Sequence, residues 1–367
     1  MKKTTTWVTA VATAILATLA SLGLSTPAFA APEAQPPIAT TGNYNWVSTS
    51  ADGTIAATYS GASGMTVYNS STKTAVSYSA ATLGLINAGE AVVSPDGSEI
   101  YILGDNPQRV VVLDVGSGTI TQTITLPFAG WIGAVTPDGS ALLVYAKTAK
   151  QILKIDLSTY APVGSPLVMA ADYPYQMCIT SDSSTLYSPG YDQDYTSVID
   201  VSSLTLTTQL PDTSGPYTCA LGADDTLYIG DYDSGAIRKY AADGSSITSA
   251  NGLVDEMFGI GLTCNSVIVG DYQNAGFKLL DRTSLAQTGT LNSVNYTYMM
   301  AVNHAATITW VGAYAAATGL QQVTDTNCAL ANTGVDSSTI GTSVAVSAGL
   351  LAAGAIALVM VRRRRNG

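Results

Sequence analysis

The sequence predicts an all-β fold, a single seven-bladed β-propeller of four-stranded blades over residues 43–325, and three observations support it. A short turn motif with an aspartate recurs at intervals of 44, 42, 44 and 42 residues, at Asp52, Asp96, Asp138, Asp182 and Asp224. Each repeat contains four short runs with the patterns of β-strands, and no stretch between residues 43 and 325 has helical periodicity. Four strands in a period of about 40 to 45 residues are typical of propeller blades.

The second repeat shows the pattern of a blade most completely. Its four expected strands cover residues 89–93, 99–103, 110–113 and 119–126, and turn residues such as Asp96-Gly97 separate them. Weaker copies of the turn at 264–266 and 304–306 bring the number of repeats to seven. We expect the recurrent aspartates to accept hydrogen bonds from backbone N–H groups of their own turns.

Two repeats also resemble a known family. The segments SPDGSEIYILGDNPQRVVVLDVGSGTITQTI and TPDGSALLVYAKTAKQILKIDLST are similar to the YVTN-type β-propeller repeat of bacterial and archaeal surface proteins. Tyr101-Ile102-Leu103, followed by Gly104, occupies the place of the tetrapeptide that names that repeat. The resemblance is good over residues 91–127 and looser elsewhere, and it implies a propeller exposed at the cell surface.

Closure of the ring requires a strand from the start of the chain. The seventh repeat offers only three strands, at 298–302, 307–313 and 320–323. We expect Ile38 to Thr41 to supply the missing outer strand, which would remove an exposed sheet edge. Within the N-terminal segment 31–42, residues 31–37 (APEAQPP) would then form a Pro-rich leader.

The composition excludes two classes of protein. The chain has 367 residues, of which 47% are hydrophobic and 11% charged, and this apolar content is too high for a disordered chain. Its net charge of −11 and isoelectric point near 4.3 would repel a phosphate backbone, so nucleic acid is not an expected partner.

The first 30 residues have the features of a secretory signal peptide. Lys2 and Lys3 precede an apolar stretch at 8–24, and Ala28-Phe29-Ala30 provides small residues for cleavage after Ala30. An uncleaved N-terminal membrane anchor is the alternative.

The C-terminus carries three ordered elements, the first of which lies within a linker at 326–341. Residues 342–361 contain no charge and are long enough for a transmembrane helix, and the basic tail 362–367 would stay on the cytoplasmic side. Within the linker stands the pentapeptide Leu330, Ala331, Asn332, Thr333 and Gly334.

This order of pentapeptide, apolar helix and basic tail resembles the cell-wall sorting signal of Gram-positive surface proteins, in the LAxTG variant of actinobacterial class E sortase substrates. The resemblance implies that a sortase cuts between Thr333 and Gly334 and joins the threonine carbonyl to a wall or pilin amine. A permanent membrane anchor with a chance pentapeptide is the alternative.

The four cysteines of an exported chain are expected to form two disulfides. Alignment of Leu186-Tyr187 with Leu227-Tyr228 places Cys178 and Cys219 at equivalent positions of neighbouring blades. This favours the pair Cys178–Cys219 and leaves Cys264 for Cys328, although the sequence alone allows three connectivities. Metal binding by these cysteines is not expected, because they form no C-x-x-C pair.

Tyrosine and aspartate recur in the loops expected at one face of the ring. The loops between the second and third strands of blades carry Tyr191, Asp192, Asp231, Tyr232, Asp271 and Tyr272, and the connections between blades carry Tyr173, Tyr175 and Tyr217. Tyrosine combines a flat apolar ring with a hydroxyl, which suits stacking on sugars, peptides or cations. These residues predict a binding or adhesion module for an extracellular glycan or protein; the alternative is that they serve only blade packing and loop capping.

Catalysis is the competing functional hypothesis. The only histidine, His304, aligns with the turns at the opposite face, so no catalytic residue is assigned and no cofactor is expected. A hydrolase or lactonase would have to use carboxylates or Ca²⁺ held by Asp192, Asp194, Asp231, Asp233 and Asp271. A purely structural role in the cell wall is the third hypothesis.

Overall fold

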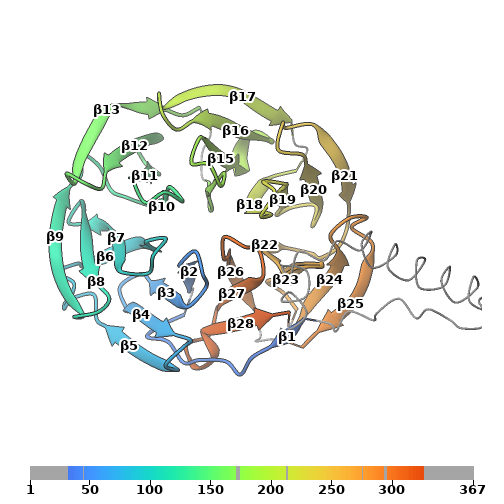
Figure 1. Ribbon diagram of the computed structural model, residues 1–367, viewed down its shortest axis with the longest axis horizontal. Helices are drawn as coiled ribbons and strands as arrows, with labels where there is room; N and C mark the ends of the chain where they lie inside the picture. The colour runs from blue at the N-terminus through green and yellow to red at the C-terminus, as the bar shows by residue number, and fades with distance from the viewer. Residues whose placement is uncertain are drawn as a thin grey trace, which may run out of the picture. The chain divides into compact units, whose positions relative to one another are not determined.

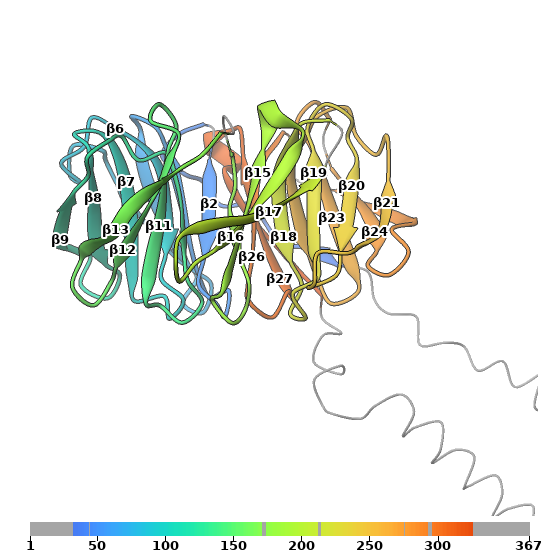
Figure 2. The ribbon, with the colours of Figure 1, turned by 90° about the horizontal axis from the view of Figure 1, so that it is seen from above.

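The computed structural model describes residues 32–325 apart from 44, 171–173, 212–213, 275 and 293–295, and these residues belong to one compact unit. Seven antiparallel sheets of four strands each surround a central axis (Figure 1). The predicted all-β, seven-bladed propeller is therefore confirmed. Seen from the side, the strands run between two faces covered by loops (Figure 2).

Each of the first six blades is a meander of four consecutive strands. Blade 1 comprises β2 (Trp46–Thr49), β3 (Ile55–Ser60), β4 (Gly64–Asn69) and β5 (Thr74–Tyr78), and blade 2 comprises β6 (Asn87–Val93), β7 (Glu99–Asn106), β8 (Arg109–Asp114) and β9 (Thr119–Thr125). Blade 3 comprises β10 (Ile132–Val135), β11 (Ala141–Ala146), β12 (Gln151–Asp156) and β13 (Ala161–Val168). Blade 4 comprises β14 (Cys178–Ile179), β15 (Thr185–Gly190), β16 (Tyr195–Asp200) and β17 (Thr205–Pro211).

The remaining blades follow the same order. Blade 5 comprises β18 (Pro216–Leu221), β19 (Leu227–Asp231), β20 (Ile237–Tyr240) and β21 (Ser246–Ala250), and blade 6 comprises β22 (Met257–Leu262), β23 (Ser266–Asp271), β24 (Phe277–Asp281) and β25 (Gln287–Leu291). Blade 7 comprises β26 (Thr297–Val302), β27 (Ile308–Ala313), β28 (Leu320–Thr324) and the N-terminal β1 (Glu33–Ala34). The 3-10 turns η1 (Tyr191–Gln193) and η2 (Ala316–Thr318) lie in loops.

Burial follows the position of a strand in its blade. The second strands β3, β11, β19 and β23 are buried along their whole length, because both faces of the sheet pack against neighbouring blades. The fourth strands, such as β5 and β9, expose most of their residues at the rim and are rich in threonine and serine. The continuous apolar runs of the sequence therefore mark the inner part of each blade.

The recurrent aspartates organise the turns between the first and second strands. Asp52 accepts hydrogen bonds from the Ser50 hydroxyl at 2.6 Å and from the Thr54 N–H at 2.9 Å. The hydroxyls of Ser94, Thr136 and Thr180 donate in the same way to Asp96, Asp138 and Asp182. The predicted hydrogen bonds within these turns are confirmed, and the glycine after Asp52 has φ of +77°, which favours glycine.

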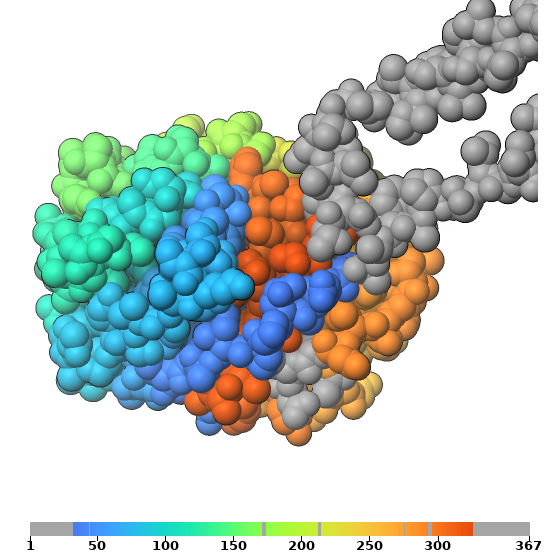
Figure 3. Space-filling view, turned by 60° about the horizontal axis from the view of Figure 1, so that its bottom comes forward, coloured from blue at the N-terminus to red at the C-terminus, as the bar shows by residue number. Residues whose placement is uncertain are grey.

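The N-terminal segment closes the ring, but at other residues than predicted. β1 pairs antiparallel with β28, Glu33 opposite Thr324 and Ala34 opposite Val323, whereas Ile38 forms only an isolated bridge to Leu320. Closure by the N-terminal segment is therefore confirmed, but the strand lies at 33–34, inside the expected leader 31–37, and of the expected strand 38–41 only Ile38 pairs with β28. Figure 3 shows the blue N-terminal segment beside the orange C-terminal strands.

The two prolines explain this difference. Pro36 and Pro37 have no N–H, so they interrupt the ladder between the N–H of Gln35, which donates to Gln322, and that of Ile38, which donates to Leu320. Proline is compatible with an edge strand because one side of its backbone faces solvent. A proline-rich segment can therefore supply the outermost strand of a blade.

The disulfide Cys178–Cys219 is present, as repeat alignment predicts. Its S–S distance is 2.04 Å, and it joins β14 of blade 4 to β18 of blade 5. Cys264 is also disulfide-bonded. Its expected partner, Cys328, lies outside the described residues.

The other terminal predictions also fall outside the described part of the chain. These are the signal peptide, the pentapeptide 330–334, the helix at 342–361 and the basic tail. Between residues 32 and 325, as far as they are described, no helix has the length and apolar character to cross a membrane.

Candidate functional site

Aromatic side chains recur at the beginning of the innermost strand of a blade. In blades 3 to 7, the residue seven positions before the turn aspartate or its equivalent is aromatic. In blade 1, the aromatic residue stands six positions before the aspartate. The six residues are Trp46, Trp131, Tyr175, Tyr217, Phe258 and Tyr298. They lie at the end of the ring that also carries the loops between second and third strands, because strands of a meander alternate in direction.

Five of these rings contact one another in a closed circuit, which we call the aromatic plug: Trp46, Tyr175, Tyr217, Phe258 and Tyr298. Ring centroids are 6.1 Å apart for Trp46–Tyr175, 4.0 Å for Tyr175–Tyr217, 5.0 Å for Tyr217–Phe258, 5.5 Å for Phe258–Tyr298 and 5.6 Å for Tyr298–Trp46. Blades 1 and 4 are not neighbours, so the Trp46–Tyr175 stack crosses the central axis. The plug therefore lies across the channel at this end.

Loop tyrosines of blades 4 to 6 extend the plug toward solvent. Tyr191 lies 5.9 Å from Tyr217, Tyr232 lies 5.2 Å from Phe258, and Tyr272 stacks on Phe258 at 4.6 Å. All three loop tyrosines are partly exposed. We call Tyr191, Tyr232 and Tyr272 the aromatic surface, which is continuous with the plug beneath it.

Two further tyrosines continue this surface over blade 7. Tyr296 precedes β26, is 46% exposed and lies 6.3 Å from Tyr272, and Tyr314 follows β27 and lies 5.6 Å from Tyr272. The continuous run of rings thus extends from blade 4 to blade 7.

The hydroxyl groups of Tyr191 and Tyr232 are neutral near pH 7. Burial raises the pKa of Tyr232 to about 12, and the nearby Glu256 carboxylate adds to the effect. Burial and the Asp233 carboxylate raise the pKa of Tyr191 in the same direction. Tyr217 is 4% exposed, and its burial raises its pKa strongly. The surface therefore offers uncharged rings and hydroxyls beside acidic groups.

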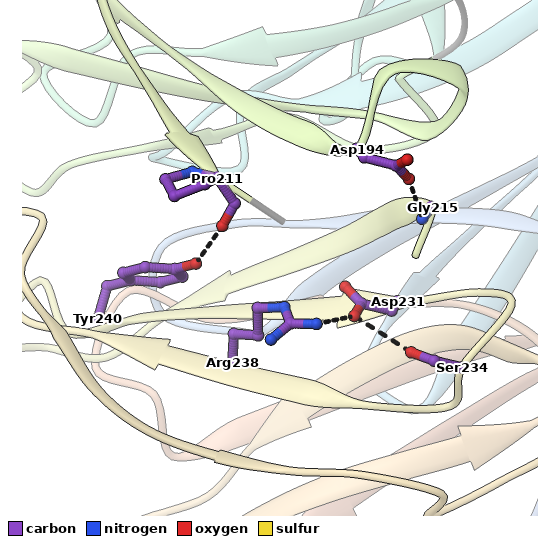
Figure 4. A network of polar contacts seen from close by, with 7 residues as sticks. All are labelled: Asp194, Pro211, Gly215, Asp231, Ser234, Arg238 and Tyr240. Carbon is purple, nitrogen blue, oxygen red and sulfur yellow. Dashed lines mark hydrogen bonds and ion pairs between the residues drawn. The ribbon is translucent and has the colours of Figure 1, made fainter. Parts of the chain in front are cut away.

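Two of the predicted ligand-binding aspartates are turned away from this surface. Asp231 is fully buried, and its Oδ2 accepts from Arg238 at 3.0 Å and from the Ser234 hydroxyl at 3.2 Å (Figure 4). Asp271 is 7% exposed and accepts from the N–H of Gln273 at 2.8 Å. These carboxylates hold their own loops in shape, so a ligand at the surface would not reach them.

Other carboxylates face solvent at the edge of the aromatic surface. Asp192 is exposed on η1, and exposed Asp233 accepts from the Tyr191 hydroxyl at 3.4 Å. Glu256 accepts from the Gln273 side chain at 2.9 Å. The acidic character predicted for this face is thus carried by Asp192, Asp233 and Glu256.

A convergent carboxylate site is not found among the residues that the structure describes. There, no three His, Cys, Asp or Glu side chains lie together so as to hold a metal ion. Asp194 accepts from the N–H of Gly215 at 3.1 Å, which fixes the loop between blades 4 and 5 (Figure 4). His304 lies in the turn between β26 and β27, at the opposite end of the channel, as its alignment predicts.

Blade 2 interrupts the recurrence of aromatic residues. It carries Gly89 at the aligned position, where a Cβ would lie 2.0 Å from the carbonyl oxygen of Trp131. A hollow of about 450 Å³ opens here beside Trp46 and Trp131 and is also lined by Ser63 and Asn87. Lys147 lies 4.3 Å above the Trp131 ring. This hollow adds a concave feature to the same face of the propeller.

The sequence predicts part of this site but not all of it. Tyr175, Tyr191, Tyr217, Tyr232 and Tyr272 lie together, while Tyr173 lies outside the described residues. The residues not predicted as part of the site are Trp46, Trp131, Phe258 and Tyr298. The signal that finds them is the shared position seven residues before the turn aspartate.

Comparisons with known proteins support the fold. No protein-family model matches the chain, and no curated protein sequence matches it. Among solved structures, a chain of the mitotic checkpoint complex is similar with a TM-score of 0.66 at 14% identity, covering 82% of this chain and 94% of that one. The Myceliophteria thermophila Cps50 (Swd1) β-propeller domain gives 0.63 at 12% identity, covering 80% and 99%.

A third similar structure is Kuenenia stuttgartiensis hydrazine synthase, with a TM-score of 0.62 at 12% identity, covering 79% of this chain and 97% of that one. At identities this low, the structural similarity establishes a shared propeller architecture. They carry no further statement about activity.

Proposed function

We propose that this protein is an extracellular binding module, which uses the aromatic surface and its acidic edge to adhere to a protein partner. The observation that carries the proposal is the continuous set of rings from the plug to the loop tyrosines, partly exposed and bordered by Asp192, Asp233 and Glu256. Tyrosine and tryptophan supply much of the binding energy in protein interfaces, and cationic side chains bind well over aromatic rings beside carboxylates. A partner rich in lysine and arginine fits this surface.

The hollow beside Trp46 and Trp131 supports the same proposal. An interface gains affinity where a side chain of the partner enters a pocket and excludes water. Uncharged Ser63 and Asn87 line the hollow, whereas acidic groups surround the tyrosines of blades 4 to 6. The two regions offer an anchoring pocket and an electrostatic contact on one face.

The site favours binding over the hydrolase or lactonase hypothesis. The carboxylates of Asp231 and Asp271 accept hydrogen bonds from residues of their own blades, and His304 lies at the other end of the channel. The propeller structures similar to this one include a chain of the mitotic checkpoint complex. This agrees with a role in protein interaction.

The proposal includes display at the cell surface. The disulfide Cys178–Cys219 agrees with an oxidising, extracellular location. The sorting pentapeptide Leu330–Gly334 supports attachment through Thr333 by a sortase. Mass spectrometry of protein released by muramidase is expected to find a peptide ending at Thr333 joined to a wall fragment; an intact C-terminus reaching Gly367 would contradict attachment.

Binding is tested by a screen of residues 31–329 against arrays of extracellular proteins and glycans. A variant with Tyr191, Tyr232 and Tyr272 replaced by alanine is expected to lose the captured partner, each anchor contributing about 2 kcal/mol or more. A matched control replaces Ile120 and Leu206 by alanine, since these are 43% and 45% exposed on outer strands. Equal binding by the triple variant and the wild type would refute the role of the aromatic surface.

A further inference from the structure

The central channel below the aromatic plug contains a carboxylate that the proposed function does not use. Glu90 lies on β6, where neighbouring positions are apolar, and its Oε2 accepts from the N–H of Gly133 at 2.9 Å. Its side chain is partly exposed to a pocket of about 220 Å³. The rest of the pocket wall near Glu90 includes Val47, Val92, Ala134 and Met177.

The residue of blade 4 that is equivalent to Glu90 has hydrogen bonds typical of a polar group with a structural role. Gln176, like Glu90, stands six residues before the turn aspartate of its blade. Its Nε2 donates to the Met300 carbonyl at 2.9 Å, and its Oε1 accepts from the Thr218 hydroxyl at 2.5 Å. Gln176 thus joins three blades, whereas Glu90 has a single hydrogen bond, on one oxygen, within the part of the chain that the structure describes.

Access to Glu90 is from the face opposite the aromatic surface. The same pocket is lined at its mouth by turn residues of several blades, among them Ser50, Pro95, Asp225 and His304. From Pro95 to Glu90 the strand extends about 16 Å, at about 3.3 Å per residue. A ligand that reaches Glu90 from this mouth must therefore be long.

The charges along this path favour a cation at both ends. Asp225 at the mouth accepts from the N–H and hydroxyl of Ser181 at 2.8 and 2.7 Å, and it is partly exposed. Asp225 and His304 are the other titratable residues that line the pocket. Between the two carboxylates the wall combines apolar residues such as Val92 and Met177 with polar ones such as Ser48, so a methylene chain has apolar contacts over part of its length.

We infer that the central channel binds a linear aliphatic polyamine, with one terminal ammonium group at Glu90 and another near Asp225. The inference is independent of the aromatic surface, which lies at the other end of the channel. A buried carboxylate is strongly stabilised by a cationic hydrogen-bond donor, because the surrounding medium screens the charge poorly.

Protonation of Glu90 gives amine binding at this site a measurable consequence. Burial raises the pKa of Glu90 to about 8, although the Gly133 N–H opposes the shift. Free Glu90 is therefore mostly protonated at pH 7, and an ammonium group that pairs with the carboxylate must displace its proton. Binding at pH 7 is expected to release a proton to the buffer.

Isothermal titration calorimetry of the protein with spermine, and with the shorter monoamine butylamine, tests the inference. Spermine is expected to bind at physiological salt with an enthalpy that depends on the ionisation enthalpy of the buffer. Glu90→Gln, which keeps the shape of the side chain, is expected to weaken binding at least about tenfold and to abolish that buffer dependence. Butylamine is expected to bind more weakly, because it cannot reach both carboxylates.

The control is Asp192→Asn, which removes an exposed carboxylate at the opposite face and should leave spermine affinity nearly unchanged. Equal losses in Glu90→Gln and Asp192→Asn would show that spermine only follows the negative charge of the whole protein, and would overturn the inference. Unchanged binding by a folded Glu90→Gln protein would overturn it as well. Thermal unfolding of each variant without ligand verifies that it is folded.

Discussion

Closure of blade 7 by β1 can be tested by deleting residues 32–39. The deletion removes two backbone hydrogen bonds between Ile38 and Leu320, at 2.7 and 3.1 Å, and the bond from the Gln35 N–H to Gln322 at 2.8 Å. It also removes the bond from the Gln321 side chain to the Gln35 carbonyl at 2.8 Å. At about 1 kcal/mol each, these four bonds contribute about 4 kcal/mol.

The deletion also uncovers apolar surface. Leu320 and Val323 of β28 are fully buried, and partial exposure of both adds on the order of 1 to 2 kcal/mol. A total near 5 kcal/mol is a large part of the roughly 5 to 15 kcal/mol that stabilises a folded domain. We therefore expect the melting temperature to fall by roughly 10 to 20 °C, at about 2 to 4 °C per kcal/mol for a large domain.

Differential scanning calorimetry of the deletion variant and the wild type gives this shift directly. Glu33→Ala is the matched control, because Glu33 is exposed and its replacement keeps the β1 backbone; its effect should stay within about 0.5 kcal/mol. The exposed edge of β28 should also make the deletion variant self-associate, visible by size-exclusion chromatography. An unchanged melting temperature in the deletion variant would refute closure by β1.

Three further predictions concern the disulfide, acid stability and the channel. Replacing Cys178 and Cys219 by alanine should cost about 4 kcal/mol in urea unfolding, from loop closure over a separation of 41 residues; no loss would contradict a role in stability. Ten turn aspartates have lowered pKa values, Asp200 to about 2 through hydrogen bonds from Ser203. Their contribution to stability should therefore be complete above about pH 4 and be lost toward pH 2; a flat urea midpoint between pH 4 and pH 2 would contradict this. Glu90 has the opposite effect on stability: because its pKa is raised to about 8, the wild type should lose stability between pH 5 and pH 8. In Glu90→Gln the melting temperature should not show this loss. Identical pH profiles of the melting temperature in the two proteins would contradict the burial of the carboxylate.

Much of the fold follows from the sequence because the fold is a repeat. The spacing of the turn aspartates defines the blades, and one alignment offset between neighbouring blades predicts the pair Cys178–Cys219. The closing strand is harder to locate, since it lies outside the repeat. Its prolines favour the prediction of a leader. An edge strand nevertheless tolerates proline, because only one side of its backbone needs hydrogen bonds.

The candidate site is less predictable, because it depends on contacts across the ring. Trp46 and Tyr175 belong to blades 1 and 4, and only closure of the propeller brings their rings together. Residue type also leaves side-chain direction open: Asp231 and Asp192 occur in similar loops, but Asp231 pairs with Arg238 inside the blade while Asp192 faces solvent. Glu90 is visible in the sequence as a charged residue in an apolar inner strand.

Hydrogen–deuterium exchange of the protein with and without a partner captured by the array tests the central claim most directly. The claim is that the face carrying Tyr191, Tyr232 and Tyr272 contacts the partner. It predicts protection of the loops at 190–194, 231–236 and 271–276, and unchanged exchange in the turns around Asp52, Asp96 and Asp138 at the other face. Protection confined to those turns, with none in the tyrosine loops, would contradict it.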